Sequence, residues 1–178
     1  MDFFKRIIDA FSVVTGRTDV IAYTAQAGYQ LQVKYLHESH IGIEAPKKDG
    51  DTGYDLVIGE DVLLPAHTKI PINTRTYVAV KIPSGFWGAI VPRSSANKRG
   101  IKIPFSTIDE GYIGELFSAA HNDTDEDILL KKGDRISQLV IQPRFCPEIA
   151  VVKELPQTER GETGFGSTNK KHQESLII

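Results

Sequence analysis

The sequence predicts an all-β protein, either a sandwich or a barrel, built from many short strands. From Leu31 onward, apolar and polar residues alternate in short runs, which is the period of a half-buried strand. Turns such as Pro83-Ser84-Gly85 and Lys132-Gly133-Asp134 separate the runs, and no helical pattern comes between them. A succession of short strands without helices is typical of β-sandwiches and β-barrels.

The strand pattern begins near residue 31 and continues almost to the end of the chain. We expect strands at residues 31–35, 54–58, 62–64, 68–72, 76–82, 86–91, 101–103, 128–130, 135–142 and 149–155. Between residues 106 and 117, Glu110-Gly111 breaks the apolar pattern and Gly114 allows a close approach of the backbone. We expect a β-hairpin there with Asp109 and Tyr112 in a half-buried mouth, where a carboxylate is a candidate general base. A plain surface turn is the alternative, since Asp and Gly are ordinary turn residues.

Three segments are expected: an N-terminal extension at residues 1–30, a β domain at residues 31–157, and a flexible C-terminal arm at residues 158–178. Within the extension, the spacing of apolar residues predicts an amphipathic helix from Asp2 to Val14. We expect its apolar face to pack on its own protein, with a membrane anchor or a partner-binding helix as alternatives. The arm is too polar and glycine-rich to order itself.

Composition excludes several classes of protein. The chain has 178 residues, a formal net charge of −2 and a single cysteine, Cys146. The charge argues against a surface that coats nucleic acid, and the lone cysteine excludes an intrachain disulfide or a cysteine-rich metal site. No apolar run approaches the length that spans a membrane. We therefore expect no nucleic-acid or membrane partner and a reducing, cytoplasmic location, which for a phage protein is the host cytoplasm.

Five short stretches carry chemistry, and each alone is weak evidence. Arg93 suits bidentate phosphate binding, and Ser94 and Ser95 add neutral donors. In the arm, Arg160 and the run Gly166-Ser167-Thr168 could wrap a phosphate, while Phe165 could stack on a base. In chain order the five stretches are T-G-Y-D-L at 52–56, P-R-S-S at 92–95, I-D-E-G-Y-I-G-E at 108–115, G-D-R-I-S-Q-L at 133–139 and R-G-E-T-G-F-G-S-T at 160–168.

Taken together, the five stretches resemble those of the trimeric dUTPase family, the deoxyuridine 5′-triphosphate nucleotidohydrolases. A phage or bacterial member is one candidate. The resemblance implies a jelly-roll-like β fold and a homotrimer whose active sites are shared between subunits. One subunit would supply the first, second and fourth stretches, a second the third stretch, and a third its arm. The implied reaction is the Mg²⁺-dependent hydrolysis of dUTP to dUMP and pyrophosphate, by attack of water on the α-phosphorus.

The resemblance also implies roles for individual residues. Asp109 would deprotonate the attacking water, and Tyr112 would pack beneath the deoxyribose and exclude a ribose 2′-hydroxyl. Asp55 would contact Mg²⁺ through water. Uracil would be read by the segment that contains Ser106, Thr107, Ile108 and Phe117, although the family usually has glycine where this chain has Ser106. Phosphates would be held by Arg93, Ser94, Ser95 and Gln138, with the terminal phosphate clamped by Arg160, Gly166, Ser167 and Thr168 and with Phe165 stacked over uracil.

Two alternative functions remain open from the sequence. dCTP deaminases have a related fold and similar stretches, but their catalytic glutamate falls ten residues after the aspartate, where this chain has Ala119. A regulatory protein that keeps the dUTPase fold and binds a partner is the second alternative, as is known for some phage members of the family. The complete set of site residues favours the hydrolase.

Overall fold

The structure is a computed structural model that describes residues 30–158 and residue 161. The predicted helix at residues 2–14 lies outside the described residues, as do Arg160, Phe165, Gly166, Ser167 and Thr168. The chain divides into two units, residues 1–145 and residues 146–178. Every strand of the described residues belongs to the first unit.

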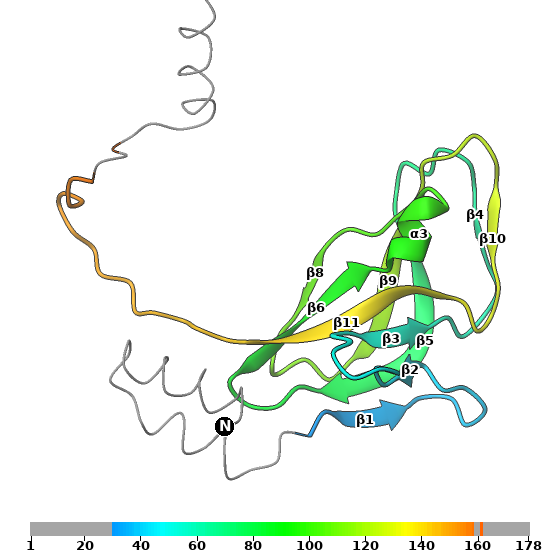
Figure 1. Cartoon of the computed structure of the whole chain (residues 1–178), viewed down its shortest axis with the longest axis horizontal. Coiled ribbons are helices and arrows are strands. Elements are labelled where there is room, and N and C mark those ends of the chain that lie inside the picture. The colour runs from blue at the N-terminus through cyan, green and yellow to red at the C-terminus, as the bar shows by residue number, and fades with distance from the viewer. Residues whose placement is uncertain (1–29, 159–160, 162–178) are drawn as a thin grey trace, which may run out of the picture. The chain divides into compact units, whose positions relative to one another are not determined.

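The first unit is almost entirely β-structure, as the sequence predicts (Figure 1). Its elements are β1 (Gln32–Tyr35), β2 (Ile43–Glu44), β3 (Tyr54–Val57), β4 (Val62–Leu64), β5 (Ile72–Lys81), β6 (Phe86–Pro92), α3 (Ser94–Lys98), β7 (Ile101–Lys102), β8 (Ser106–Ile108), β9 (Glu115–Asn122), β10 (Ile128–Leu130) and β11 (Arg135–Pro143). No helix of these residues is long and apolar enough to cross a membrane.

Two antiparallel sheets and a short ribbon make up the fold. The five-stranded sheet has the order β2-β3-β11-β6-β8, and the four-stranded sheet has the order β1-β5-β9-β7. The ribbon pairs β10 with β4, with Leu129 opposite Leu63. Hydrogen bonds also join the two large sheets, because the buried hydroxyl groups of Ser118 on β9 and Ser137 on β11 bond to each other.

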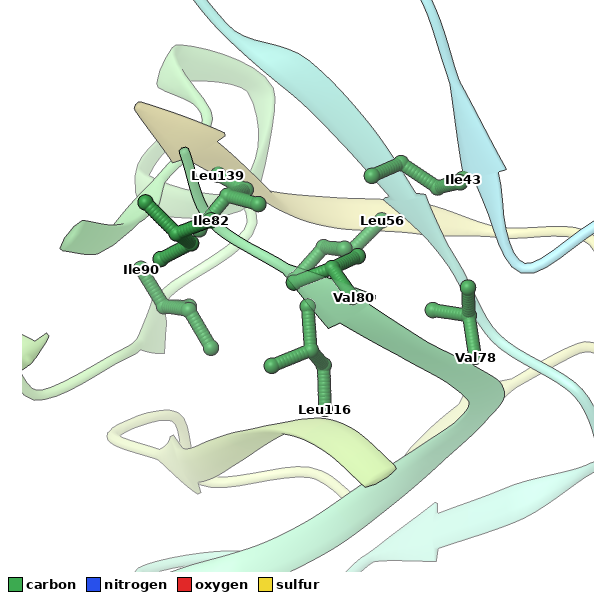
Figure 2. Packing of buried hydrophobic residues seen from close by; sticks show 8 residues of the cluster. All are labelled: Ile43, Leu56, Val78, Val80, Ile82, Ile90, Leu116 and Leu139. Atoms are coloured by element: carbon green, nitrogen blue, oxygen red, sulfur yellow. The ribbon is translucent and has the colours of Figure 1, made fainter. Parts of the chain in front are cut away.

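The core lies between the two large sheets, and both sheets contribute to it (Figure 2). Alternation is clearest on β9, where Leu116 and Ser118 are buried while Phe117 between them is exposed. One cluster consists of Ile43, Leu56, Val78, Val80, Ile82, Ile90, Leu116 and Leu139. A second cluster, near α3 and the ribbon, consists of Ile58, Leu64, Ala96, Ile101, Ile103, Ala120, Leu130 and Ile136.

Four details of the predicted elements were wrong. The strand predicted at 68–72 does not form, and β5 instead runs unbroken from Ile72 to Lys81. A short helix, α3, follows β6 and buries Ala96 in the second cluster. The sequence did not predict it, because the segment is too short to show a helical period. Although β1 forms, all its residues are exposed, since β5 is the only neighbour that it has among the described residues. Residues 149–155 form no strand and are exposed, because no described strand pairs with them.

Candidate functional site

The segment from Ser106 to Phe117 links the two sheets, so the predicted hairpin was wrong. β8 pairs with β6 in the five-stranded sheet, with Ser106 opposite Ile90, whereas β9 pairs with β5 and β7 in the four-stranded sheet. Residues 109–114 therefore cross from one sheet to the other, and the Tyr112 N–H closes a turn on the Asp109 carbonyl at 3.0 Å. An alternating pattern shows that two runs are strands but not which strands they join.

The crossing opens a pocket of about 270 Å³ between the two sheets, which we call the β8–β9 pocket. The site residues that the sequence predicts between positions 106 and 117 all line this pocket. It is lined by Asn73, Ile90, Ser106, Thr107, Ile108, Asp109, Tyr112, Glu115, Leu116, Phe117 and Ala119. The lining combines apolar residues with polar ones, which is typical of pockets that bind small ligands.

Asp109 lies at the rim of the β8–β9 pocket and is exposed, not half-buried as predicted. The residue after it, Glu110, ties this turn to the body of the protein. Its carboxylate accepts the N–H of Gly85 at 3.0 Å and pairs with Arg144 at 3.1 Å. A hydrogen bond from Ser84, together with these two groups, holds the pKa of the Glu110 carboxyl below its usual range. The Asp109 carboxylate is thus open to water while the backbone beneath it is anchored.

Tyr112 also lines the pocket. Its hydroxyl donates to the carbonyl of Glu115 at 2.9 Å, and 40% of the residue surface remains exposed. Gly114 explains how the ring fits, because a Cβ at that position would approach the tyrosine hydroxyl oxygen to 2.5 Å. Ser106, in turn, points its hydroxyl back to the Pro104 carbonyl at 3.3 Å.

The other predicted site residues meet on the five-stranded sheet, in a group that we call the polar cluster: Asp55, Arg93 and Gln138. Gln138 on β11 lies directly opposite both Asp55 on β3 and Val91 on β6. Arg93, just beyond β6, places its Nε 3.2 Å from Asp55 Oδ1. Gly53 leaves room for the glutamine, since a Cβ there would come within 2.1 Å of Gln138 Oε1.

Further charges surround the polar cluster. The Arg93 N–H donates to the Ile136 carbonyl at 2.9 Å, and Ser94 and Ser95 open α3 immediately after it, both exposed. On β11, the strand that carries Gln138, Arg135 forms a two-point ion pair with Glu44, with contacts of 2.6 and 3.1 Å. This bond lowers the pKa of Glu44 and raises that of Arg135. The cluster therefore offers guanidinium, hydroxyl and amide donors, which is the set that binds phosphate.

The polar cluster and Asp109 lie at opposite ends of β6. Ile108 is opposite Gly88, so Asp109 lies beside Trp87, whereas Arg93 follows the other end of the strand. At about 3.3 Å of rise per residue, the six positions between them correspond to roughly 20 Å. Within one chain, Asp109 and Arg93 are therefore well separated along β6.

A metal ion would find few protein ligands. No group of three or more His, Cys, Asp or Glu side chains within the described ranges has the arrangement of a metal site. Asp55 offers one carboxylate, with 18% of its side chain exposed, and it is shared with Arg93. One carboxylate beside phosphate donors fits Mg²⁺, which keeps several waters and is commonly bound by substrate phosphates with only one or two carboxylates.

Another hollow, of about 640 Å³, lies at residues 124–129 beside Arg99. It is lined by Asp125, Glu126 and Asp127, so it would repel a polyphosphate.

Within the β8–β9 pocket, sequence reasoning missed Asn73 and Glu115. Glu115 shares the outward face of β9 with Phe117, and the period of two could have revealed it. Asn73 comes from β5, whose pairing with β9 no local pattern shows.

A sequence model of the dUTPase family matches residues 39–169. This chain belongs to the dUTPase family. The deoxyuridine 5′-triphosphate nucleotidohydrolase of Paramecium bursaria Chlorella virus 1 is 44% identical over 121 residues, which cover 67% of this chain and 84% of the viral protein. The mitochondrial dUTPase of Homo sapiens is 42% identical over 144 residues, which cover 80% of this chain and 56% of the human protein.

Solved dUTPases share this fold. A mutant of the Staphylococcus bacteriophage 80alpha dUTPase with dUpNHpp is similar with a TM-score of 0.72 and 31% identity, covering 78% of this chain and 98% of the phage chain. A mutant dUTPase of phage phi11 of S. aureus, described with a structural Mg(II) ion, gives a TM-score of 0.64 at 28% identity over 70% of this chain and 97% of the phage chain. The predicted all-β fold of the dUTPase type is thus confirmed, and its two sheets are consistent with a jelly roll.

Proposed function

We propose that this protein hydrolyses dUTP to dUMP and pyrophosphate, with Mg²⁺ as cofactor. The observation that carries the proposal is the β8–β9 pocket of a dUTPase-family chain, with the open carboxylate of Asp109 at its rim. Uracil enters the pocket between β8 and β9, where main-chain groups near Ser106 and Phe117 meet its polar edge. Main-chain donors and acceptors discriminate strongly between bases, because a wrong base leaves them without hydrogen-bond partners.

Asp109 acts as the general base. Its exposed carboxylate accepts a proton from a water molecule as that water forms a bond to the α-phosphorus. The bond from the α-phosphorus to the oxygen that bridges to the β-phosphorus breaks, and pyrophosphate leaves with that electron pair. The proton passes from Asp109 to solvent. The anchored backbone at Glu110 keeps the carboxylate in place during this step.

The polar cluster binds the phosphates. Arg93 exchanges its contact with Asp55 for phosphate oxygens, and Gln138 with the two exposed serines adds neutral donors. Asp55, once released, would be the side chain that holds Mg²⁺ through water. The ion would neutralise phosphate charge and fix the shape of the triphosphate. Arg160, Gly166, Ser167 and Thr168 of the arm close over the terminal phosphate, with Phe165 over uracil.

We propose a homotrimer with shared sites, and the separation of roughly 20 Å along β6 between Asp109 and Arg93 of one chain supports it. We infer that Asp109 and Tyr112 of one subunit face the polar cluster of a neighbour. A closed, threefold-symmetric ring repeats this contact identically and forms three equivalent sites. Residues 158–178 would then serve as an arm for a site between other subunits, and residues 1–30 as an extension outside the catalytic domain.

A dCTP deaminase is the weaker alternative. Deamination at this site would need the acid that the deaminase motif has ten residues after the aspartate, and Ala119 lines the pocket instead. No uncommitted carboxylate replaces it, because Glu115, the other acid of the lining, is bonded to Arg75.

The test is to incubate the protein with each deoxynucleoside triphosphate and Mg²⁺ and to identify the products by chromatography. We expect dUMP and pyrophosphate from dUTP, with little turnover of dTTP or dCTP. Ammonia from dCTP would establish the deaminase instead, and equal turnover of dTTP would remove the proposed base selectivity. Omission of Mg²⁺ should lower turnover of dUTP, and unchanged turnover would refute the role given to the ion.

A further inference from the structure

Tyr77 has a backbone conformation that is rare for a residue with a side chain. Its φ is +52°, in the left-handed region, and it lies where the pairing of β5 with β9 shifts between Arg75 and Ala79. Such strain persists only where surrounding contacts hold it, and it gathers at functional sites. Here the tyrosine hydroxyl donates to Glu60 at 2.8 Å, and the Arg75 guanidinium lies 4.5 Å from the ring centroid.

Donors from this strained part of β5 bond to one carboxylate, that of Glu115. The Tyr77 N–H donates to Oε1 at 2.9 Å, and Arg75 Nη2 donates to Oε2 at 2.7 Å. Only 13% of the Glu115 side chain is exposed, compared with 51% for Arg75. Burial alone would raise the pKa of Glu115, but the guanidinium and the backbone donors outweigh it and hold the pKa below its usual range. This carboxylate is saturated with donors, so it is a poor proton acceptor for catalysis.

The backbone of Glu115 contacts Tyr112, which lines the same pocket. Its carbonyl accepts the hydroxyl of Tyr112 at 2.9 Å, and the preceding Gly114 lies against the same tyrosine ring. The position of the ring therefore depends on the backbone at residues 114 and 115. That backbone is fixed from β5 by the Glu115 side chain.

We propose that Glu115 is a positioning residue that sets the preference for deoxyribose over ribose. The clamp formed by Arg75, Tyr77 and Glu115 fixes the first residue of β9. The Glu115 carbonyl then holds the Tyr112 ring in the position that leaves no room for a ribose 2′-hydroxyl. This inference rests on the proposed function, because it assigns a role within the dUTP site. Arg75 does not line the pocket: its guanidinium bonds to Glu115 and its backbone lies opposite Phe117, and the contact with Glu115 is the route that we assign to its effect on sugar choice.

The experiment measures kcat/KM for dUTP and for UTP in the full-length protein with Glu115→Gln or Arg75→Gln. Either change removes a charged hydrogen bond, so the ratio of the two values should fall about tenfold. Arg75 is half exposed, so its variant should fold even if a Glu115 variant does not. Asp61→Asn is the matched control: that carboxylate also accepts from a lysine, at 2.8 Å, and from a backbone N–H, at 2.9 Å, but away from the pocket.

Tyr112→Phe determines whether the clamp acts through the tyrosine. It should lower the ratio by itself, and Arg75→Gln should then cause no further fall. A further fall in the Tyr112→Phe background, or a wild-type ratio in both clamp variants, would overturn the proposal. Dissociation constants for dUTP and UTP, measured by calorimetry in an Asp109→Asn background, report the preference between the two sugars without hydrolysis. If the wild-type protein does not hydrolyse dUTP, the proposed function fails, while these constants still decide whether the clamp selects the sugar.

Discussion

Complementation between two inactive variants tests the inferred division of the site. Arg93→Ala removes the guanidinium of the polar cluster, and Asp109→Asn removes the carboxylate at the opposite end of β6. Each homotrimer should be nearly inactive. In equal, random mixtures, half of the sites receive an intact Asp109 and half receive an intact Arg93 from a different chain. About a quarter of all sites then have both, and every trimer that contains both variants has one such site in three, so purified mixed trimers should reach about a third of the wild-type turnover.

The assay is steady-state hydrolysis of dUTP by mixed trimers, purified through a different affinity tag on each variant. A matched control combines Arg93→Ala with Gln138→Ala, which alter the same cluster. No mixed site can regain both of those side chains, so turnover should not exceed the average of the two parent proteins. Inactivity of confirmed Arg93→Ala and Asp109→Asn mixtures would refute the shared site and the separation on which it rests.

Three further predictions concern the chemistry and the stability of the fold. Asp109→Asn should lower turnover by about two to four orders of magnitude while calorimetry still detects dUTP binding; near-normal turnover would exclude Asp109 as the base. Leu139→Ala, in the core, should cost about 2–5 kcal/mol of unfolding free energy in urea titrations, whereas the half-exposed Leu129→Ala should cost clearly less; equal losses would contradict the core assignment. Because the pKa of Glu115 is lower in the folded than in the unfolded chain, its carboxylate stabilises the fold above its ordinary value of 4.5, and this contribution is lost as the pH falls below it. The difference in melting temperature between wild type and Glu115→Gln should therefore shrink from pH 7 to pH 3, and a constant difference would show that the charge is not responsible.

The sequence predicted the type and place of most strands, because burial of one sheet face forces a period of two. The limits of β4 and β10 agree with the prediction to the residue. It failed where structure depends on distant partners. Residues 149–155 are rich in apolar residues, but among the described residues no strand pairs with them. The helix α3 buries Ala96 in the second core cluster, a contact that the local sequence does not show.

The candidate site shows the same limit. Arg93 and Gln138 could be chosen from their motifs, and the structure brings them together with Asp55 through the register of β3, β11 and β6. Local sequence could not show that Tyr77 is strained or that Arg75 reaches Glu115 across forty residues. Those contacts depend on the pairing of β5 with β9 and on its irregularity.

The separation of Asp109 from the polar cluster is a consequence of how β6 and β8 are joined. The chain leaves β6 at Pro92, passes through α3 and β7, and returns antiparallel along β6 as β8. Residues close in sequence thus lie at opposite ends of one strand. β6 is held by β11 along its whole length and by β8 at Gly88, Ala89 and Ile90. A motion that brought Asp109 to Arg93 of the same chain would have to break the β6–β8 ladder and expose its backbone groups. Association of subunits would bring the two groups together without that loss, which is why we infer a site built from more than one chain.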